Sequence, residues 1–301
     1  MLKYDLHSHT NASDGQLTPA DLIDRAIEKG VDVLAITDHD SISGVIEGTH
    51  YMQILRQTPT ANPLILVSGI EVSTQWQNKD IHIVGLNIDI DSPALLSLIQ
   101  AQKAKRVARA ELMGARLAKA NIPDAYLGAK SFADNDANIT RAHFAKWLVA
   151  QGYAKNMNEV FKKYLVRGKP GYVPPPWCDM MEAIDVIHQA GGRAVLAHPL
   201  HYKLTTKWLR RLIVAFKQAQ GDAMEIAYPQ QNIQQRRYLA NFANEYALFT
   251  SQGSDFHYPT PWLDLGRNLY QLEDVVPVWY DWNIEENEGR DLNGVGFIYS
   301  S

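Results

Sequence analysis

The sequence has little cysteine and no long apolar segment. Cys178 is the single cysteine among 301 residues, so no disulfide can form within the chain, and a reducing compartment is expected. No stretch approaches the roughly 20 apolar residues of a transmembrane helix, and the start at Met1–Asp5 lacks the apolar core of a signal peptide. These absences predict a cytoplasmic protein without membrane attachment.

The chain also has no excess of positive charge, with 29 lysines and arginines against 33 aspartates and glutamates. The formal net charge is -4 at pH 7, which argues against a broad basic surface for long duplex DNA. Basic residues gather in Lys103–Arg109, followed by Arg116 and Lys119, and the helical apolar spacing there favours a solvated helix face over a phosphate guide. Any nucleic acid that binds is therefore expected to be short or held at one end.

Histidine and carboxylate side chains accompany several short apolar runs. His7 and His9 alternate in an extended segment, so both imidazoles point to one face, where one divalent cation can bind both. Similar pairings occur in Val33–Asp40, Leu64–Glu71, Ile81–Val84, Ala194–Pro199 and Gly253–His257. Barrels of parallel strands collect catalytic residues at the carboxyl ends of the strands, so these side chains are expected to converge. Because no thiolate is among them, they suit hard or borderline cations.

These segments form an ordered set of motifs: His-x-His from His7, Ser-Asp-Gly from Ser13, Thr-Asp-His-Asp from Thr37, Gly-Ile-Glu from Gly69, His-Ile-Val-Gly from His82, Ala-His-Pro from Ala197 and Ser-Asp-x-His from Ser254. In this order they resemble the PHP (polymerase and histidinol phosphatase) family of metal-dependent phosphoesterases. Three further stretches, Ile139–Phe144, Lys169–Pro174 and Trp262–Arg267, are similar to the branch of ribonuclease AM and 3',5'-nucleoside bisphosphate phosphatase.

Strand-like and helix-like stretches alternate along much of the chain. Thr18 with Pro19 predicts a capped helix that ends near Gly30, and Met180–Gln189 predicts another. The alternation gives about seven strand–helix units. Together with the resemblance, it predicts an α/β protein with a distorted seven-stranded (β/α)7 TIM-like barrel, the PHP fold, and an inserted helical module.

The chain is expected to divide into four segments. Residues 1–92 form the first part of the barrel. The pattern then changes to consecutive helices over 93–190, which we interpret as an inserted substrate or lid module. The barrel resumes over 191–284, and the polar, glycine-containing residues 285–301 are expected to form a loosely held tail.

The resemblance implies nine metal ligands and three divalent metal ions. One ion would be held by His7, His9, Glu71 and Asp255, a second by Glu71, His82 and His198, and a third by Asp14, His39 and His257. A carboxylate has two oxygens and can span cations about 3.5–4 Å apart, which suits Glu71 as a bridge. Mixed nitrogen and oxygen ligands without sulfur suit Mn, Fe or Zn and do not choose among them; Mn is expected first, with Zn, Fe or Mg as alternatives.

Such a site implies hydrolysis by a metal-bound water, with no side-chain nucleophile. Asp38 and Asp40 flank His39 and are expected to orient its ring or to hold the turn. His198 and His257 could also protonate the leaving group, but ligand roles are favoured for both.

Substrate selection is expected from residues outside the ligand set. Arg141 and His143 lie in the Thr-Arg-Ala-His stretch shared with the bisphosphate phosphatases, and a guanidinium can grip a second phosphate in bidentate fashion. The alternative is that Thr140 caps a helix and Arg141 is merely exposed. Lys169 and Tyr172 are weaker candidates for the same pocket. No partner motif accompanies three other histidines, and ordinary roles are expected for His50, His188 and His201.

The resemblance implies two activities on related substrates. One converts a nucleoside 3',5'-bisphosphate to a nucleoside 5'-monophosphate and phosphate; the other trims short 5'-monophosphorylated RNA as a 5'-to-3' exoribonuclease. Both anchor a 5'-phosphate and cleave the neighbouring 3' ester, so one enzyme with both activities is preferred. Alternatives are a phosphatase of another small phosphomonoester, such as histidinol phosphate, and a non-catalytic metal-stabilised binding module. The binding module is disfavoured because all nine ligand positions of the family carry a suitable residue here. No obligate protein partner is inferred.

Overall fold

The computed structural model describes residues 2–57, 64–133 and 139–282. Two compact units divide the chain, the first made of Met1–Leu96 and Cys178–Ser301 and the second of Ser97–Trp177. The second unit is shorter than the insert predicted over 93–190, because the helix after Cys178 packs on the sheet of the first unit. The expected tail, 285–301, lies outside the described residues.

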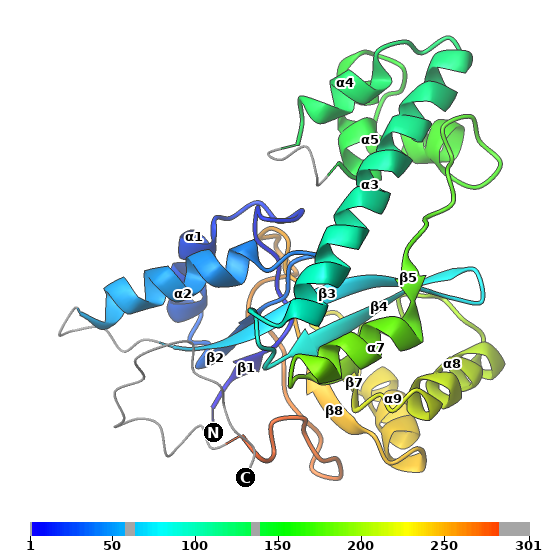
Figure 1. Ribbon diagram of the computed structural model, residues 1–301. Helices are drawn as coiled ribbons and strands as arrows, with labels where there is room; N and C mark the ends of the chain where they lie inside the picture. The colour runs from blue at the N-terminus through cyan, green and yellow to red at the C-terminus, as the bar shows by residue number, and fades with distance from the viewer. Residues whose placement is uncertain (1, 58–63, 134–138, 283–301) are drawn as a thin grey trace. The chain divides into compact units, whose positions relative to one another are not determined.

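A mixed sheet forms the centre of the first unit (Figure 1). The strands follow the order β1 (Tyr4–Asp5), β2 (Val33–Ile36), β3 (Ile65–Trp76), β4 (Lys79–Leu86), β6 (Arg193–Leu196), β7 (Ala223–Ala227) and β8 (Phe249–Gln252), while β5 (Cys178–Asp179) pairs with β3. Leu6 N donates a hydrogen bond to Gln252 O, and His9 N donates to Phe256 O. These bonds bring the two ends of the sheet together, so the predicted seven-stranded α/β barrel is confirmed as a nearly closed one.

The hairpin of β3 and β4 departs from the predicted run of strand–helix units. β3 extends to Trp76 because it pairs antiparallel with β4 from Gly69 opposite Leu86 to Trp76 opposite Lys79. Gln77 and Asn78 join the strands with φ values of 48° and 60°, the double positive φ of a tight hairpin turn. The amino end of β4 therefore lies at the same end of the barrel as the carboxyl ends of the parallel strands.

Amphipathic helices cover the sheet of the first unit. They are α1 (Pro19–Glu28), α2 (Ser43–Arg56), α7 (Met180–Gln189), α8 (Thr206–Gln218) and α9 (Ile233–Glu245). The predicted cap of α1 is confirmed, since Thr18 accepts a hydrogen bond from Asp21 N and Pro19 opens the helix. Apolar burial holds these helices on the sheet. On α8, for example, Leu212 and Phe216 are fully buried, and each such side chain contributes roughly 1.5–3 kcal/mol.

The second unit is helical and has a core of its own. Its helices are α3 (Pro93–Lys119, which starts in the first unit), α4 (Ala125–Lys130), α5 (Arg141–Ala150), α6 (Met157–Val160) and the π-helix η2 (Phe161–Leu165). Leu117, Phe144 and Leu148 are fully buried in this core. None of the helices within the described ranges is long and apolar enough to cross a membrane.

The basic stretch of α3 is only partly solvated. Arg106 and Arg109 are each 8% exposed, and their guanidinium carbons lie 4.5 and 5.5 Å from the ring centroid of Trp177. Arg109 Nε also donates to Val173 O at 3.1 Å. The interpretation of Lys103–Arg109 as a solvated face is therefore wrong for these two arginines, because an arginine can bury its side chain against an aromatic ring.

Candidate metal centre

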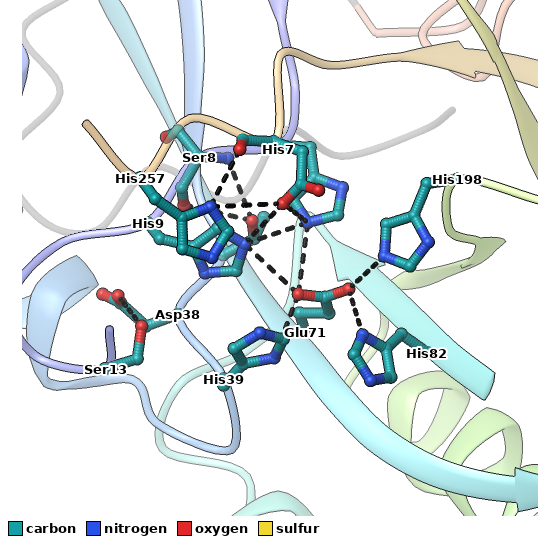
Figure 2. A network of polar contacts seen from close by, with 12 residues as sticks. His7, Ser8, His9, Ser13, Asp38, His39, Glu71, His82, His198 and His257 are labelled. Atoms are coloured by element: carbon teal, nitrogen blue, oxygen red, sulfur yellow. Dashed lines mark hydrogen bonds and ion pairs between the residues drawn. The ribbon is translucent and has the colours of Figure 1, made fainter. Parts of the chain in front are cut away.

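The nine residues predicted as ligands lie close together at one end of the barrel. Figure 2 labels seven of them: His7, His9, His39, Glu71, His82, His198 and His257. Seven of the nine come from segments that follow β1, β2, β6 and β8, as the sequence pattern suggests. Glu71 and His82 instead lie within β3 and β4. His82 reaches the same place because β4 runs antiparallel to its neighbours, so its amino end lies at the ligand end.

The tightest group joins two imidazoles and two carboxylates. His7 Nε2 and His9 Nε2 are 3.2 Å apart, and each lies 3.2 Å from Glu71 Oε2. Asp255 Oδ1 lies 3.2 Å from His9 Nε2 and 3.6 Å from His7 Nε2. Metal–ligand bonds of about 2.0–2.2 Å in a tetrahedral arrangement place ligand atoms about 3.3–3.6 Å apart, so these four atoms have the spacing of one metal site.

Glu71 faces a second group through its other oxygen. Its Oε1 lies 2.8 Å from His82 Nδ1 and 3.0 Å from His198 Nε2, whereas Oε2 lies 3.0 Å from His39 Nδ1. The Glu71 side chain is fully buried. A carboxylate with imidazoles arranged around each of its oxygens has the geometry of a bridge between two cations.

A third group surrounds Asp14. Its Oδ1 lies 3.3 Å from His257 Nε2, and its Oδ2 lies 3.9 Å from His39 Nε2. His9 also offers a nitrogen within 4.8 Å of the other ligand atoms of this group. His9 and His39 thus each belong to two groups, an overlap that the sequence pattern did not indicate.

The charges of the cluster favour bound cations. Burial raises the pKa of Glu71, but the positive charges of His39 and His7 outweigh it and hold that pKa well below its usual range. Burial lowers the pKa of His9, but hydrogen bonds with Asp255 and Glu71 outweigh it and raise this pKa to about 10. The carboxylates are therefore ionised, and either protons on the imidazoles or metal ions balance their charge.

Unpartnered buried atoms provide a test of whether the residues fit metal ions. Glu71 Oε2, Asp14 Oδ1 and His39 Nδ1 are buried without a hydrogen-bond partner. A buried polar atom left in this state costs about 1–3 kcal/mol. Metal ions would give all three a partner, and six imidazoles with three carboxylates form a donor set for divalent transition metals. The residues present therefore fit the metal ions that the sequence implies.

Asp38 and Asp40 hold backbone segments that carry ligands. Asp38 accepts hydrogen bonds from Thr10 N, Thr10 Oγ1 and Ser13 Oγ at 2.8, 2.7 and 2.6 Å, which fixes the turn between His9 and Asp14. Asp40 Oδ1 accepts from Ser73 N at 2.9 Å. Gly44 lies against this network, since a Cβ there would come within 2.0 Å of Asp38 Oδ2.

Glu225 belongs to the site but was missed from the sequence. Its Oε1 lies 2.7 Å from His7 Nδ1, and its Oε2 accepts a hydrogen bond from His198 N at 2.6 Å. His198 has a φ of 28° directly before Pro199, a strained conformation that this bond helps to hold. The available signal was a single acid in the middle of the otherwise apolar strand Ala223–Ala227.

The remaining residues singled out from the sequence are outside the predicted ligand set. Arg141 is the first residue of α5 in the second unit, Thr140 caps that helix, and His143 Nδ1 accepts from Thr140 N at 3.0 Å. In the same unit Lys169 is exposed and Tyr172 half-buried. The three histidines expected to be ordinary differ in surroundings: His50 is exposed on α2, His188 lies 2.8 Å from Asp222, and His201 stacks on His198 with 5.2 Å between ring centroids.

A barrel with this ligand cluster at the strand ends defines a metal-dependent phosphoesterase of the PHP class. The chain belongs to the PHP family, whose PHP domain model matches residues 5–166. It is 50% identical to the 5'-3' exoribonuclease Rnm of Escherichia coli (strain K12), over 94% of this chain and 95% of the relative. It is 38% identical to the 3',5'-nucleoside bisphosphate phosphatase of Chromobacterium violaceum, over 92% of this chain and 94% of the relative.

Solved structures support the same class. An amidohydrolase from Chromobacterium violaceum, crystallised with sulfate and without metal, matches with a TM-score of 0.81 and 38% identity, covering 92% of this chain and 94% of that one. A metal-dependent phosphoesterase from Bifidobacterium adolescentis matches with a TM-score of 0.74 and 27% identity, covering 88% of this chain and 91% of that one.

The role of Glu225 can be tested with an isosteric substitution. Glu225→Gln should weaken metal binding by about 10- to 100-fold, because an amide offers one acceptor where two donors, His7 Nδ1 and His198 N, need partners. Competition with a chromophoric chelator measures this affinity. Glu182→Gln, at an exposed position in the first turn of α7, is the control. If the two variants bind metal with equal affinity, Glu225 does not contribute to metal binding.

Proposed function

We propose that the chain hydrolyses nucleoside 3',5'-bisphosphates to nucleoside 5'-monophosphates and phosphate, and that it trims short 5'-monophosphorylated RNA from the 5' end. The observation that carries this proposal is the buried Glu71, whose two oxygens face separate groups of imidazoles. The substrate class comes from the relatives, one named an exoribonuclease and one a bisphosphate phosphatase, each aligned over more than nine-tenths of this chain. In both reactions the cleaved ester lies at a 3' position next to a 5'-phosphate.

Three metal ions are proposed, with Mn first and Zn, Fe or Mg as alternatives. His7, His9, Glu71 and Asp255 would hold one ion; Glu71, His82 and His198 a second; and Asp14, His39 and His257 a third. When bound, the ions supply positive charge that lowers the pKa of a coordinated water and neutralises phosphoryl oxygens. Glu71 orients the ligands on both its sides, and Asp38 and Asp40 fix the turns that carry them.

Side-chain hydroxyl groups beside the predicted ligands already form structural hydrogen bonds, which supports water rather than a side chain as the nucleophile. Ser8 Oγ donates to Ala35 O at 2.7 Å, and Thr10 Oγ1 and Ser13 Oγ both donate to Asp38. The thiol of Cys178 is buried and lies 3.6 Å from Ser73 O. Each of these groups is thus committed to a structural hydrogen bond.

The 5'-phosphate would be bound by Arg141. This residue stands in the first turn of α5, where the helix dipole favours an anion. His143 closes the capping box of the same helix and thereby fixes the turn that presents Arg141. Lys169 and Tyr172 stay weaker candidates in the same unit. The reaction is proposed to take place in the cytoplasm.

Product analysis provides the direct test of the activity. With Mn supplied, adenosine 3',5'-bisphosphate should yield adenosine 5'-monophosphate and phosphate, and a 5'-phosphorylated RNA oligomer should shorten from its 5' end. Activity should disappear on chelation and return with metal. Adenosine 3'-monophosphate as the nucleotide product, or undiminished turnover in a fully metal-stripped sample, would contradict the proposal.

Metal content should depend most on the bridging carboxylate. Glu71→Ala should lose more metal than any single histidine variant, because Glu71 contributes an oxygen to two groups of ligands. Elemental analysis of the purified variants measures this, and we expect three ions per wild-type chain. His50→Ala, at an exposed position on α2, should keep the full content. Retention of all metal by Glu71→Ala would exclude the bridge.

Arg141 should control selectivity for the 5'-phosphate. A charge-assisted bidentate contact contributes on the order of 2–4 kcal/mol, so Arg141→Ala should lower kcat/KM for a nucleoside 3',5'-bisphosphate by roughly 30- to 1000-fold. A nucleoside 3'-monophosphate should already be a poor substrate and should lose little more. Lys146→Ala, exposed on the same helix, is the control. Equal losses on the two substrates would show that Arg141 does not recognise the 5'-phosphate.

A further inference from the structure

A cationic groove lies on the first unit outside the ligand cluster. It has a volume of about 420 Å³ between the turn of the β3–β4 hairpin and α8, and its lining includes Trp76, Gln77, Lys207 and Arg211. α8 begins just after the loop that carries His198, and loops of this kind lie at the ligand end of the barrel. The groove therefore starts at the rim that surrounds the metal centre.

Two positive charges that line this groove, those of Lys207 and Arg211, and a third beside it, that of Lys79, have no acidic partner among the described residues. Within the described ranges, no carboxylate forms an ion pair with Lys79, Lys207 or Arg211. Arg210, which also lines the groove, pairs with Glu245. The chain as a whole carries a net charge of -4, so a local excess of positive charge stands out and is complementary to an anion.

Aromatic rings hold two of these cations close together. Lys79 Nζ lies 5.0 Å and Arg211 Cζ 4.4 Å from the ring centroid of Trp208, whose ring meets that of Trp76 edge-on at 5.9 Å. Arg211 Nη2 donates to Gln77 Oε1 at 3.2 Å. Cation–π contacts order the two side chains without neutralising them, so both charges are available to a ligand.

The hairpin connects the groove to the metal centre. Lys79 is three residues from His82 along β4, and Trp76 is five residues from Glu71 along β3. At about 3.3 Å per residue, these separations are roughly 10 Å and 17 Å. A stacked nucleic-acid strand advances about 3.4 Å per nucleotide, so the groove lies roughly three to five nucleotides from the metal centre. Trp76 and Lys79 pair on the sheet face opposite to Glu71 and His82, so a bound strand would cross the edge of β4 to reach them.

We propose that this groove binds the phosphodiester backbone of single-stranded RNA three to five nucleotides downstream of the 5' end that occupies the metal centre. The inference rests on the proposed function and adds a second contact that a nucleoside bisphosphate is too short to reach. Cationic grooves of this kind bind single strands without regard to sequence. The groove would therefore favour longer substrates through affinity, while the chemistry at the metal centre stays the same.

The test compares charge reversals in the groove with a matched reversal outside it. Lys207→Glu and Arg211→Glu change exposed residues on α8, and Arg237→Glu changes an exposed residue on α9. For each variant, fluorescence anisotropy under chelation gives the Kd for a labelled, 5'-phosphorylated RNA of about ten nucleotides, and kinetics with metal give kcat/KM for this RNA and for adenosine 3',5'-bisphosphate.

Each groove variant should raise the Kd of the RNA by roughly 10-fold or more at low salt, and the difference from wild type should shrink as salt is added. KM for the RNA should rise, while kcat/KM for the bisphosphate should match that of Arg237→Glu. Retention of bisphosphate turnover also shows that the variants fold.

Three outcomes would overturn the inference: unchanged RNA affinity in both groove variants, an equal loss with Arg237→Glu, or a parallel loss on the bisphosphate. A wild-type protein that cleaves no RNA would contradict the exoribonuclease part of the proposed function. The binding measurement would still decide whether the groove holds RNA in that case.

Discussion

The buried carboxylate of Glu71 is the constraint on which the rest of the site depends. An anion removed from water is stable only with positive charge on every side, and here five imidazoles surround its two oxygens. To bring Glu71 to this position, β3 continues beyond its parallel neighbours and pairs with an antiparallel β4 that supplies His82. The antiparallel hairpin that makes the barrel irregular thus brings Glu71 and His82 together at the ligand end.

The sequence predicted the helices and the convergence of the candidate ligands better than it predicted strand direction. Caps such as Thr18 use local hydrogen bonds, which a short window of sequence reveals. The direction of β4 depends on the turn at Gln77 and Asn78, which lacks the Asn-Gly signature of a tight hairpin, so a crossover was expected there. Glu225 was missed because one acid within an apolar strand has no local motif. Its partners, His7 and His198, come from the segments after β1 and β6.

The division into two units separates the predicted ligands from the residues proposed to select the substrate. All nine predicted ligands belong to the first unit, whereas Arg141 and the other residues expected to select the substrate belong to the second, which has its own core. If the proposed role of Arg141 holds, substitutions in the second unit would alter which ester is chosen without changing the predicted ligand set. This fits the observation that relatives named for two different reactions align with nearly the whole chain.

The contacts between the first and last strands also affect how the protein is made. His9 and Asp255, which share a site, are separated by 246 positions, and His7 and Glu225 by 218. Closure of loops this long is slow and comes late in folding. During synthesis the tightest group of ligands remains incomplete until the ribosome has released the segment after β8. A chain that ends before β8 would therefore lack that group. An occupied metal centre would thus indicate that the segment after β8, which carries the last predicted ligand, had been translated.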